Sequence, residues 1–252
     1  MDPEITIITC SLTGDRLERT INSILKQTFG DWELVLVAPK DNTSAQLVVD
    51  SWNSTQAINS FVDDGIGTYW AMNLGAVHAH GTYLLFLNEG DEFHDENSLS
   101  DLKVAIGTRE WAYGRIVKIG EDGLETKYKF EPYSILFHRF GWRYVPHPAS
   151  IMKKSLFSYL GGFDVNHKIA ADQKLFLQAS RIHSPQILRK LSSKFYLGGV
   201  SSRSVLEHME EFKRISNEVF GPVLGSKYID DIFWIANALT KRIIKYLFSK
   251  FL

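Results

Sequence analysis

The first 95 residues alternate short apolar runs with amphipathic segments, and this alternation restricts the possible folds more than any other feature. Strands are predicted at 5–9, 32–37, 58–62 and 82–87, where β-branched and apolar residues are concentrated. Apolar residues at helical spacing predict helices between them, one around 17–25 and one over 68–79. Strands that alternate with helices form mostly parallel sheets covered on both faces, so we expect an α/β fold.

The second half of the chain has a different pattern. The predicted elements are a hairpin over 111–130, a short strand and a helix over 145–164, helices over 169–180 and 204–220, and a last helical stretch to the C-terminus. The hairpin is expected to turn at Glu121-Asp122-Gly123. We place a boundary near 200–226, between a main domain and a C-terminal helical extension, 201–252.

Composition excludes several classes of protein. The formal net charge of -1 argues against a nucleic-acid binder, which needs a basic surface. The single cysteine excludes an internal disulfide framework and a cysteine-based zinc cluster. We see no secretory signal and no apolar run near the ~20 residues of a spanning helix. The expectation is a cytoplasmic protein, either soluble or peripheral on the inner face of the cell membrane.

Residues 83–93, YLLFLNEGDEF, end the fourth predicted strand in a dense group of acids. Glu89, Asp91 and Glu92 lie within one short turn, and Gly90 allows the backbone to approach a ligand closely. Ligands of parallel sheets bind beyond the carboxyl ends of the strands. Mg²⁺ is commonly held there by one or two carboxylates, with water and phosphate oxygens around it. The residues alone leave two interpretations open, a cation site and an ordinary solvated turn.

The order of elements, together with the segment 63–93, resembles the nucleotide-sugar half of glycosyltransferase family two, which has the GT-A fold. The family shows three patterns in this order. The first, A-x-N-x-G, is matched by Ala71, Asn73 and Gly75, and the second, G-x-Y-x-x-F-L, by Gly81, Tyr83, Phe86 and Leu87. The third is an acidic turn, which is matched by the turn with Asp91. A subgroup reading GIYDAMNKGI…FLNSGD is closer still. HPASIMKKSLFSYLGGFDVNHKIAADQKLFL is similar to the acceptor-side segment. The resemblance covers about residues 4–200, with a nucleotide-sugar half, 1–95, and an acceptor half, 96–200.

The resemblance implies a metal-dependent inverting enzyme that moves a sugar from a nucleotide-sugar donor to a hydroxyl of a saccharide or lipid-linked saccharide, in assembly of bacterial surface polysaccharide. Asp91 matches the acid that holds Mn²⁺ or Mg²⁺ against the donor diphosphate. Asp172 matches the catalytic base, although an acid in the first turn of a helix also has a purely structural use. His147, between two prolines, either positions an acceptor or phosphate or is a structural turn residue.

The predicted donor site combines the end of the first strand with residues of the family motifs. Its members are Thr9, Cys10, Ser11, Asp41, Asp64, Asn73, Asn88 and Glu89. Cys10 is expected to be a small buried residue, because no base is paired with it. The family's acidic D-D-G-S-x-D turn after the second strand is replaced by Ala38, Pro39 and Lys40, with Asp41 as a partial substitute.

The last helical stretch carries an apolar stripe beside positive charge. The stripe is Ile232, Ile235, Leu239, Ile243, Tyr246 and Leu247, and the cations are Lys241, Arg242, Lys245 and Lys250. A basic amphipathic helix suits an anionic membrane surface, so contact through 229–252 is predicted. The alternative is a helix docked on its own domain or in a dimer.

Three other functions remain open from the sequence. A non-catalytic GT-A-like module that binds a glycan or a protein is the main alternative, and the altered 38–40 turn is its support. A nucleotidyltransferase lacks a glycine-rich, lysine-bearing phosphate loop here. A dehydrogenase is disfavoured because CSLTGD follows the first strand instead of G-x-G-x-x-G.

Overall fold

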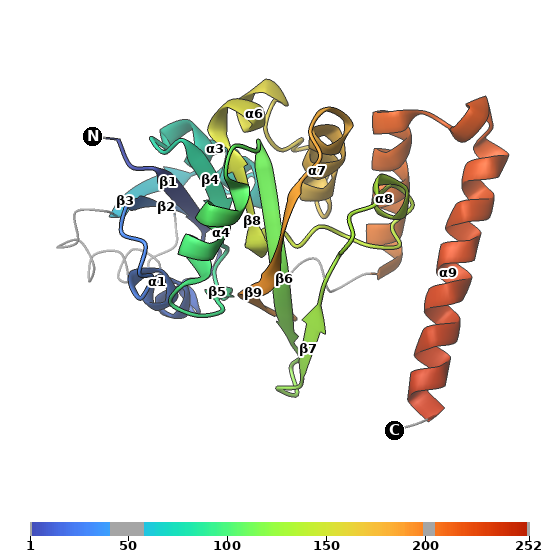
Figure 1. Ribbon diagram of the computed structural model, residues 1–252, viewed down its shortest axis with the longest axis horizontal. Helices are drawn as coiled ribbons and strands as arrows, with labels where there is room; N and C mark the ends of the chain where they lie inside the picture. Colours follow the sequence, from blue (N-terminus) through green and yellow to red (C-terminus); the bar gives the residue numbers. More distant parts are fainter. Residues whose placement is uncertain (1, 41–57, 199–204, 251–252) are drawn as a thin grey trace.

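The computed structural model describes residues 2–40, 58–198 and 205–250 (Figure 1). Its strands form one nine-stranded sheet in the order β3-β2-β1-β4-β8-β6-β9-β5, with β7 paired to β6. The strands are β1 Ile5–Cys10, β2 Trp32–Pro39, β3 Ile58–Asp63, β4 Tyr83–Phe86, β5 Glu92–Phe93, β6 Trp111–Ile119, β7 Glu125–Tyr128, β8 Ser150–Lys153 and β9 Gln186–Tyr196.

The first four strands are mutually parallel, as the alternating pattern predicts. β1 pairs with β2 and with β4, and β2 pairs with β3, so four carboxyl ends meet at one edge. β8 runs antiparallel to β4 and to β6, which makes the whole sheet mixed. The predicted α/β class with a parallel first half is confirmed, and the antiparallel strands belong to the second half of the chain.

Helices cover both faces of this sheet (Figure 1). The α-helices of the described chain are α1 Leu17–Leu25, α3 Thr68–His78, α4 Ser98–Ile106, α5 Ile135–Arg139, α6 Lys154–Tyr159, α7 Ala171–Ile182, α8 Val205–Phe220 and α9 Lys227–Lys250. The last two pack on α7 and not on the sheet. The predicted hairpin is confirmed as β6 and β7, and the predicted helices over 68–79, 169–180 and 204–220 correspond to α3, α7 and α8.

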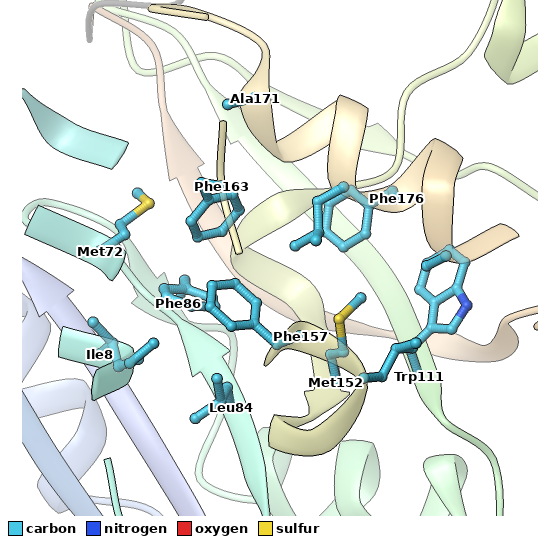
Figure 2. Packing of buried hydrophobic residues seen from close by; sticks show 14 of the residues in the cluster. Ile8, Met72, Leu84, Phe86, Trp111, Met152, Phe157, Phe163, Ala171 and Phe176 are labelled. Atoms are coloured by element: carbon cyan, nitrogen blue, oxygen red, sulfur yellow. The ribbon is translucent and has the colours of Figure 1, made fainter. Parts of the chain in front are cut away.

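Side chains that alternate along each strand supply two separate cores. Leu34 and Leu36 of β2 pack with α1 and α4, whereas Val35 and Val37 pack with α3, α6 and α7. Figure 2 shows the second core, in which Phe86 of β4 meets Phe163 edge-on at a ring-centroid distance of 4.9 Å. The end of β4 is therefore fixed against the segment that precedes α7.

A third, smaller core joins the C-terminal helices to α7. Phe212 and Ile215 of α8 and Trp234 of α9 pack with Leu177 of α7 and with Phe140. Asn237 adds a 2.8 Å hydrogen bond from its Nδ2 to the carbonyl of Phe140. The predicted extension is thus packed on the acceptor half. In the described part of the chain, no helix combines the length and the apolar character needed to cross a membrane.

Gly81 lets β4 begin directly beside β1. A Cβ at residue 81 would lie 2.5 Å from the amide nitrogen of Thr6 and 2.8 Å from the carbonyl carbon of Ile5. Backbone atoms cannot move aside as a flexible side chain can, so Gly81→Ala should lower the free energy of unfolding by about 1–3 kcal/mol. Urea denaturation measures this. Gly30→Ala is the control, because a Cβ there meets nothing within 4 Å. Equal losses in the two variants would contradict this packing.

Candidate active site

Glu89 ties the end of β4 to the loop that follows β1. Its Oε2 accepts hydrogen bonds from the amides of Leu12 (2.8 Å) and Thr13 (3.2 Å) and from Ser11 Oγ (2.9 Å). Its Oε1 accepts from Thr13 Oγ1 and from the amide of Arg16, both at 3.1 Å. Burial alone would raise the pKa of Glu89, but these hydrogen bonds outweigh burial and lower it. The carboxylate is therefore an anion with its acceptor positions in use.

Asp91, two residues later, is buried but has few hydrogen-bond donors around its carboxyl group. It is 7% exposed, and its Oδ1 lies 3.4 Å from the amide nitrogen of Tyr196 in β9. Burial raises the pKa of Asp91 to about 8, and the charge of Glu92 adds to that, while the Tyr196 N–H opposes it. The neighbouring carboxylate of Glu92 accepts a 2.6 Å hydrogen bond from the Tyr196 hydroxyl. Asp91 thus lacks a positive partner among the described residues.

Asn88 offers a second oxygen in the same turn. Its Oδ1 is buried and has no hydrogen-bond partner in the described structure. An orphaned amide oxygen and an uncompensated buried carboxylate are both ligands that hard divalent cations accept. The residues of this turn therefore fit Mn²⁺ or Mg²⁺, because a cation would supply the charge that Asp91 lacks and the partner that Asn88 lacks.

The end of β1 lies beside this turn. Thr9 Oγ1 donates a 2.8 Å hydrogen bond to the carbonyl of Leu87, and the carbonyl of Cys10 accepts from the amide of Glu89 at 3.2 Å. Cys10 is 5% exposed, and burial, with the charge of Asp63, raises the pKa of its thiol. The thiol is therefore protonated and is not a nucleophile, as expected.

Two acids at the end of β3 differ in burial. Asp63, which the sequence analysis did not select, is 5% exposed and accepts a hydrogen bond from the amide of Gly65. Asp64, which it did select, is exposed. Asp41 lies outside the described residues. Asp63 and Asp64 thus differ in burial, and no sequence pattern distinguishes them.

Asp172 lies in the first turn of α7, and neighbouring side chains hold both of its oxygens. The Tyr69 hydroxyl lies 2.9 Å from Asp172 Oδ1 and equally far from the carbonyl of Ile169. Gln173 Nε2 donates to Asp172 Oδ2 at 2.7 Å. A carboxylate oxygen has two lone pairs, so each keeps one for a further donor. Asp172 is held in one orientation and can still accept a proton.

His147 stands between the end of β4 and Asp172. Its ring centroid lies 5.7 Å from that of Phe86 and 5.7 Å from that of Phe163. Burial lowers the pKa of His147, although the charge of Asp172 opposes this. Its Nε2 is buried without a hydrogen-bond partner in the described structure. A neutral imidazole with an unused nitrogen thus lies within the electrostatic influence of Asp172.

Asn73 is used for packing between two segments. Its Nδ2 donates to the carbonyl of Phe163 at 2.8 Å, and its Oδ1 accepts from the amide of Phe163 at 2.9 Å. A Cβ on Gly162 would lie 2.7 Å from that same oxygen. This pair of hydrogen bonds explains the residue without a ligand, and its predicted role at the donor stays a prediction.

A different group has the composition of a metal site. The ligating atoms of Asp164, His167 and Glu218 all lie within 4.8 Å of one another. Lys174 Nζ lies among them, 2.5 Å from Asp164 Oδ2, 2.6 Å from Glu218 Oε2 and 3.3 Å from His167 Nε2. Burial would raise the pKa of Asp164, but the hydrogen bonds and charge of Lys174 outweigh it and lower the pKa to about 2. The ammonium group already supplies the positive charge that a metal would bring.

A pocket of about 550 Å³ lies between α3, residues 160–165 and α7. Its lining includes Trp70, Leu74 and Val77 of α3, Leu160 and Val165 before α7, and Gln178 of α7. Trp70 is 41% exposed at this wall. Most of the pocket wall is apolar.

Comparison with known proteins identifies the family. The profile of glycosyl transferase family 2 matches residues 5–160, so the chain belongs to that family. The uncharacterized glycosyltransferase Rv1514c of Mycobacterium tuberculosis is 29% identical over 207 residues, which span 79% of this chain and 78% of the relative. A PGL/p-HBAD biosynthesis glycosyltransferase of Mycobacterium bovis BCG is 29% identical over 161 residues, 62% of this chain and 61% of the relative. The chain is a glycosyltransferase.

Solved structures of similar fold include glycosyltransferases with bound donors. TarS 1–349 of S. aureus, in complex with UDP-GlcNAc, has a TM-score of 0.71 at 15% identity and covers 92% of this chain and 70% of its own. The mannosyltransferase PcManGT of Pyrobaculum calidifontis, with GDP-Man and Mn²⁺, has a TM-score of 0.59 at 13% identity, covering 96% and 76%. At these identities the likeness shows the fold, which is GT-A.

The buried state of Asp91 predicts a pH dependence of stability in the absence of metal. Its folded pKa of about 8 exceeds the ~3.9 of an unfolded aspartate, so the folded state keeps a proton that the unfolded state has lost. Stability therefore falls as pH rises from ~4 to ~8, by up to about 1.4 kcal/mol per pH unit. Asp91→Asn lacks this loss and should become progressively more stable than wild type between pH 5 and 8.

Urea denaturation in EDTA at several pH values measures the difference between variant and wild type. Glu89→Gln is the matched control in the same turn, because the lowered pKa of Glu89 keeps that carboxylate ionised throughout the range above pH 6. Its stability difference from wild type should not change with pH there. A pH-independent difference for Asp91→Asn would contradict the buried, uncompensated carboxyl group.

Proposed function

We propose that this protein is a metal-dependent, inverting glycosyltransferase that takes its sugar from a nucleotide-sugar donor. The observation that carries the proposal is the turn after β4, where buried Asp91 has a raised pKa and Asn88 Oδ1 lacks a partner. The ligands named for TarS and PcManGT, UDP-GlcNAc and GDP-Man with Mn²⁺, support a diphosphate donor and a divalent cation here. The ends of β1 and β3 are the proposed nucleoside side.

Asp91, with Asn88, would hold Mn²⁺ or Mg²⁺. Bound there, the cation supplies Lewis-acid stabilisation of the negative charge on the departing diphosphate. Glu89 acts differently, because its carboxylate fixes the loop after β1 that faces the donor. The donor positions Thr9, Cys10, Ser11, Asp41, Asp64 and Asn73 remain proposals.

Asp172 is the proposed general base. Tyr69 and Gln173 orient its carboxylate, so that a remaining lone pair can take the proton from an acceptor hydroxyl. The oxygen then attacks the anomeric carbon from the face opposite the nucleotide, which inverts the configuration. His147, neutral and within the electrostatic influence of Asp172, is proposed to bind the acceptor or a phosphate oxygen through its unused nitrogen. The proposed acceptor is a saccharide or lipid-linked saccharide of a bacterial surface glycan.

Measurements of donor binding and of turnover distinguish the proposed roles of Asp91 and Asp172. In thermal-shift assays with UDP-, GDP-, dTDP- and CMP-sugars, one donor should stabilise the wild type in Mn²⁺, by about 2.7 kcal/mol at 100 times its dissociation constant. Asp91→Asn should lose this shift. Asp172→Asn should keep the shift but lose about 10²–10⁴-fold in kcat, because only proton transfer is removed.

Each outcome of this panel has a definite reading. A metal-dependent shift without turnover on any acceptor tried would favour the non-catalytic binding module. A shift that survives Asp91→Asn would remove the cation from the turn after β4. Normal turnover in Asp172→Asn would exclude Asp172 as the base.

We further propose that α9 contacts an anionic membrane surface. Trp234 and Asn237 face the domain, whereas Ile232, Ile235 and Leu239 are 65%, 58% and 54% exposed. The predicted apolar stripe, as far as its side chains are described, therefore points away from the domain. Four cations follow Leu239 in the sequence, at Lys241, Arg242, Lys245 and Lys250, and no acid follows Asp231.

Flotation with lipid vesicles tests this contact. The wild type should float with vesicles containing phosphatidylglycerol and not with pure phosphatidylcholine. The combined change Ile232→Ser, Ile235→Ser and Leu239→Ser should reduce binding more than tenfold, because it removes three apolar side chains from the contact. Val104→Ser is the control, since Val104 is 77% exposed on α4. Dimerisation that depends on the stripe, without flotation, would favour a protein interface instead.

A further inference from the structure

Glu211 of α8 reaches the segment directly before α7. It is 5% exposed, and its Oε1 accepts hydrogen bonds from the amides of Ile169 (2.8 Å) and Ala170 (2.7 Å). Its Oε2 accepts from the amide of Lys168 at 3.1 Å. Three consecutive backbone N–H groups thus converge on one buried carboxylate. A carboxylate at the start of a helix also interacts favourably with the helix dipole.

Ile169 connects this contact to Asp172. Its amide donates to Glu211, and its carbonyl accepts from the Tyr69 hydroxyl that also reaches Asp172 Oδ1. The N-cap residue Ala170 provides no side-chain cap for α7. Glu211, from another helix, instead binds the amide of this N-cap residue and those of the two residues before it. It thereby fixes the position at which the first turn of α7, with Asp172, begins.

Packing holds the same contact from the side. Ala170 is fully buried in one cluster with Phe212 and Ile215, the neighbours of Glu211 along α8. Glu218, two turns later on α8, contacts His167 at 3.0 Å and Lys174 at 2.6 Å. α8 thus holds the segment before α7 at His167 through Glu218 and at residues 168–170 through Glu211.

We infer that Glu211 is a positioning residue for Asp172, so that the C-terminal extension completes the geometry of the active site. This rests on the proposed function of Asp172 as the base. Both Glu211 and Asp172 lie outside residues 5–160, the part that matches the family profile. The segment that carries the base is therefore held by an element that the family profile does not include.

Kinetics of Glu211→Gln test the inference. Gln has the same shape but puts an amide N–H₂ where one acceptor oxygen stood, so one or more of the three N–H groups loses its partner. We expect kcat to fall 10- to 100-fold while the donor's dissociation constant stays within twofold. In the Asp172→Asn background, the same substitution should cost no further activity. An additional loss there would overturn the inference, since Glu211 would then act independently of Asp172.

The control is Ile215→Ala, which loosens the same helix without touching the three amides. Each variant is assayed at the same interval below its own melting temperature. If Ile215→Ala then lowers kcat as much as Glu211→Gln does, the effect comes from a general loosening of α8 and the inference is wrong.

An NMR measurement that does not depend on turnover tests this inference separately from the proposed function. In protein labelled with ¹³C at aspartate carboxyls, the Asp172 resonance is the one missing in Asp172→Asn. It should shift in Glu211→Gln and stay in place in Ile215→Ala. An unchanged resonance overturns the positioning role even if the enzyme is active. A shifted resonance in a protein that shows no turnover leaves the positioning role intact and rejects the proposed function.

Discussion

The parallel pairing of β1 with β4 is the constraint on which the rest of the site depends. The register from Ile5–Tyr83 to Ile8–Phe86 brings the two strand ends to the same level. Glu89 then binds the loop after β1 through five hydrogen bonds, and its negative charge is satisfied there. Asp91, in the same turn, is buried without such donors. One turn therefore contains one acid that builds the site and one that remains available to a ligand.

The same division recurs in the second half of the chain. Asp164 is neutralised by Lys174. Among the described residues, Asp172, eight residues later, accepts hydrogen bonds only from the neutral side chains of Tyr69 and Gln173. The aromatic core joins the two halves, because Phe86 of β4 packs against both His147 and Phe163. α8, from the C-terminal part of the chain, binds the segment before α7 through Glu211 and Glu218. The acids that hold structure are paired with cations or with several amides, and the acids proposed for chemistry are not.

Most strands, the hairpin and most helices could be predicted, because the spacing of apolar residues along the sequence follows which side chains are buried. β9 could not, because Arg189, Lys190 and Lys194 interrupt its pattern and its pairing with β6 contains irregular register shifts. For the site, the resemblance assigned Asp91 to the metal and Glu89 to the donor, but it could not show that donors from residues 11–16 satisfy Glu89 and leave Asp91 without comparable partners. Glu211 could not be found at all. It lies 39 residues after Asp172, and no sequence pattern links the start of a helix to an acid on a distant helix.

The measurement that tests the central claim most directly is anomalous diffraction from crystals grown with Mn²⁺ and the donor selected by thermal shift. The account predicts a manganese peak within about 2–2.5 Å of the Asp91 carboxylate, a normal distance for carboxylate ligation, with the donor diphosphate on its other side. A peak among Asp164, His167 and Glu218, with Lys174 displaced, would contradict the assignment of the turn after β4. So would a bound donor diphosphate with no manganese peak at Asp91.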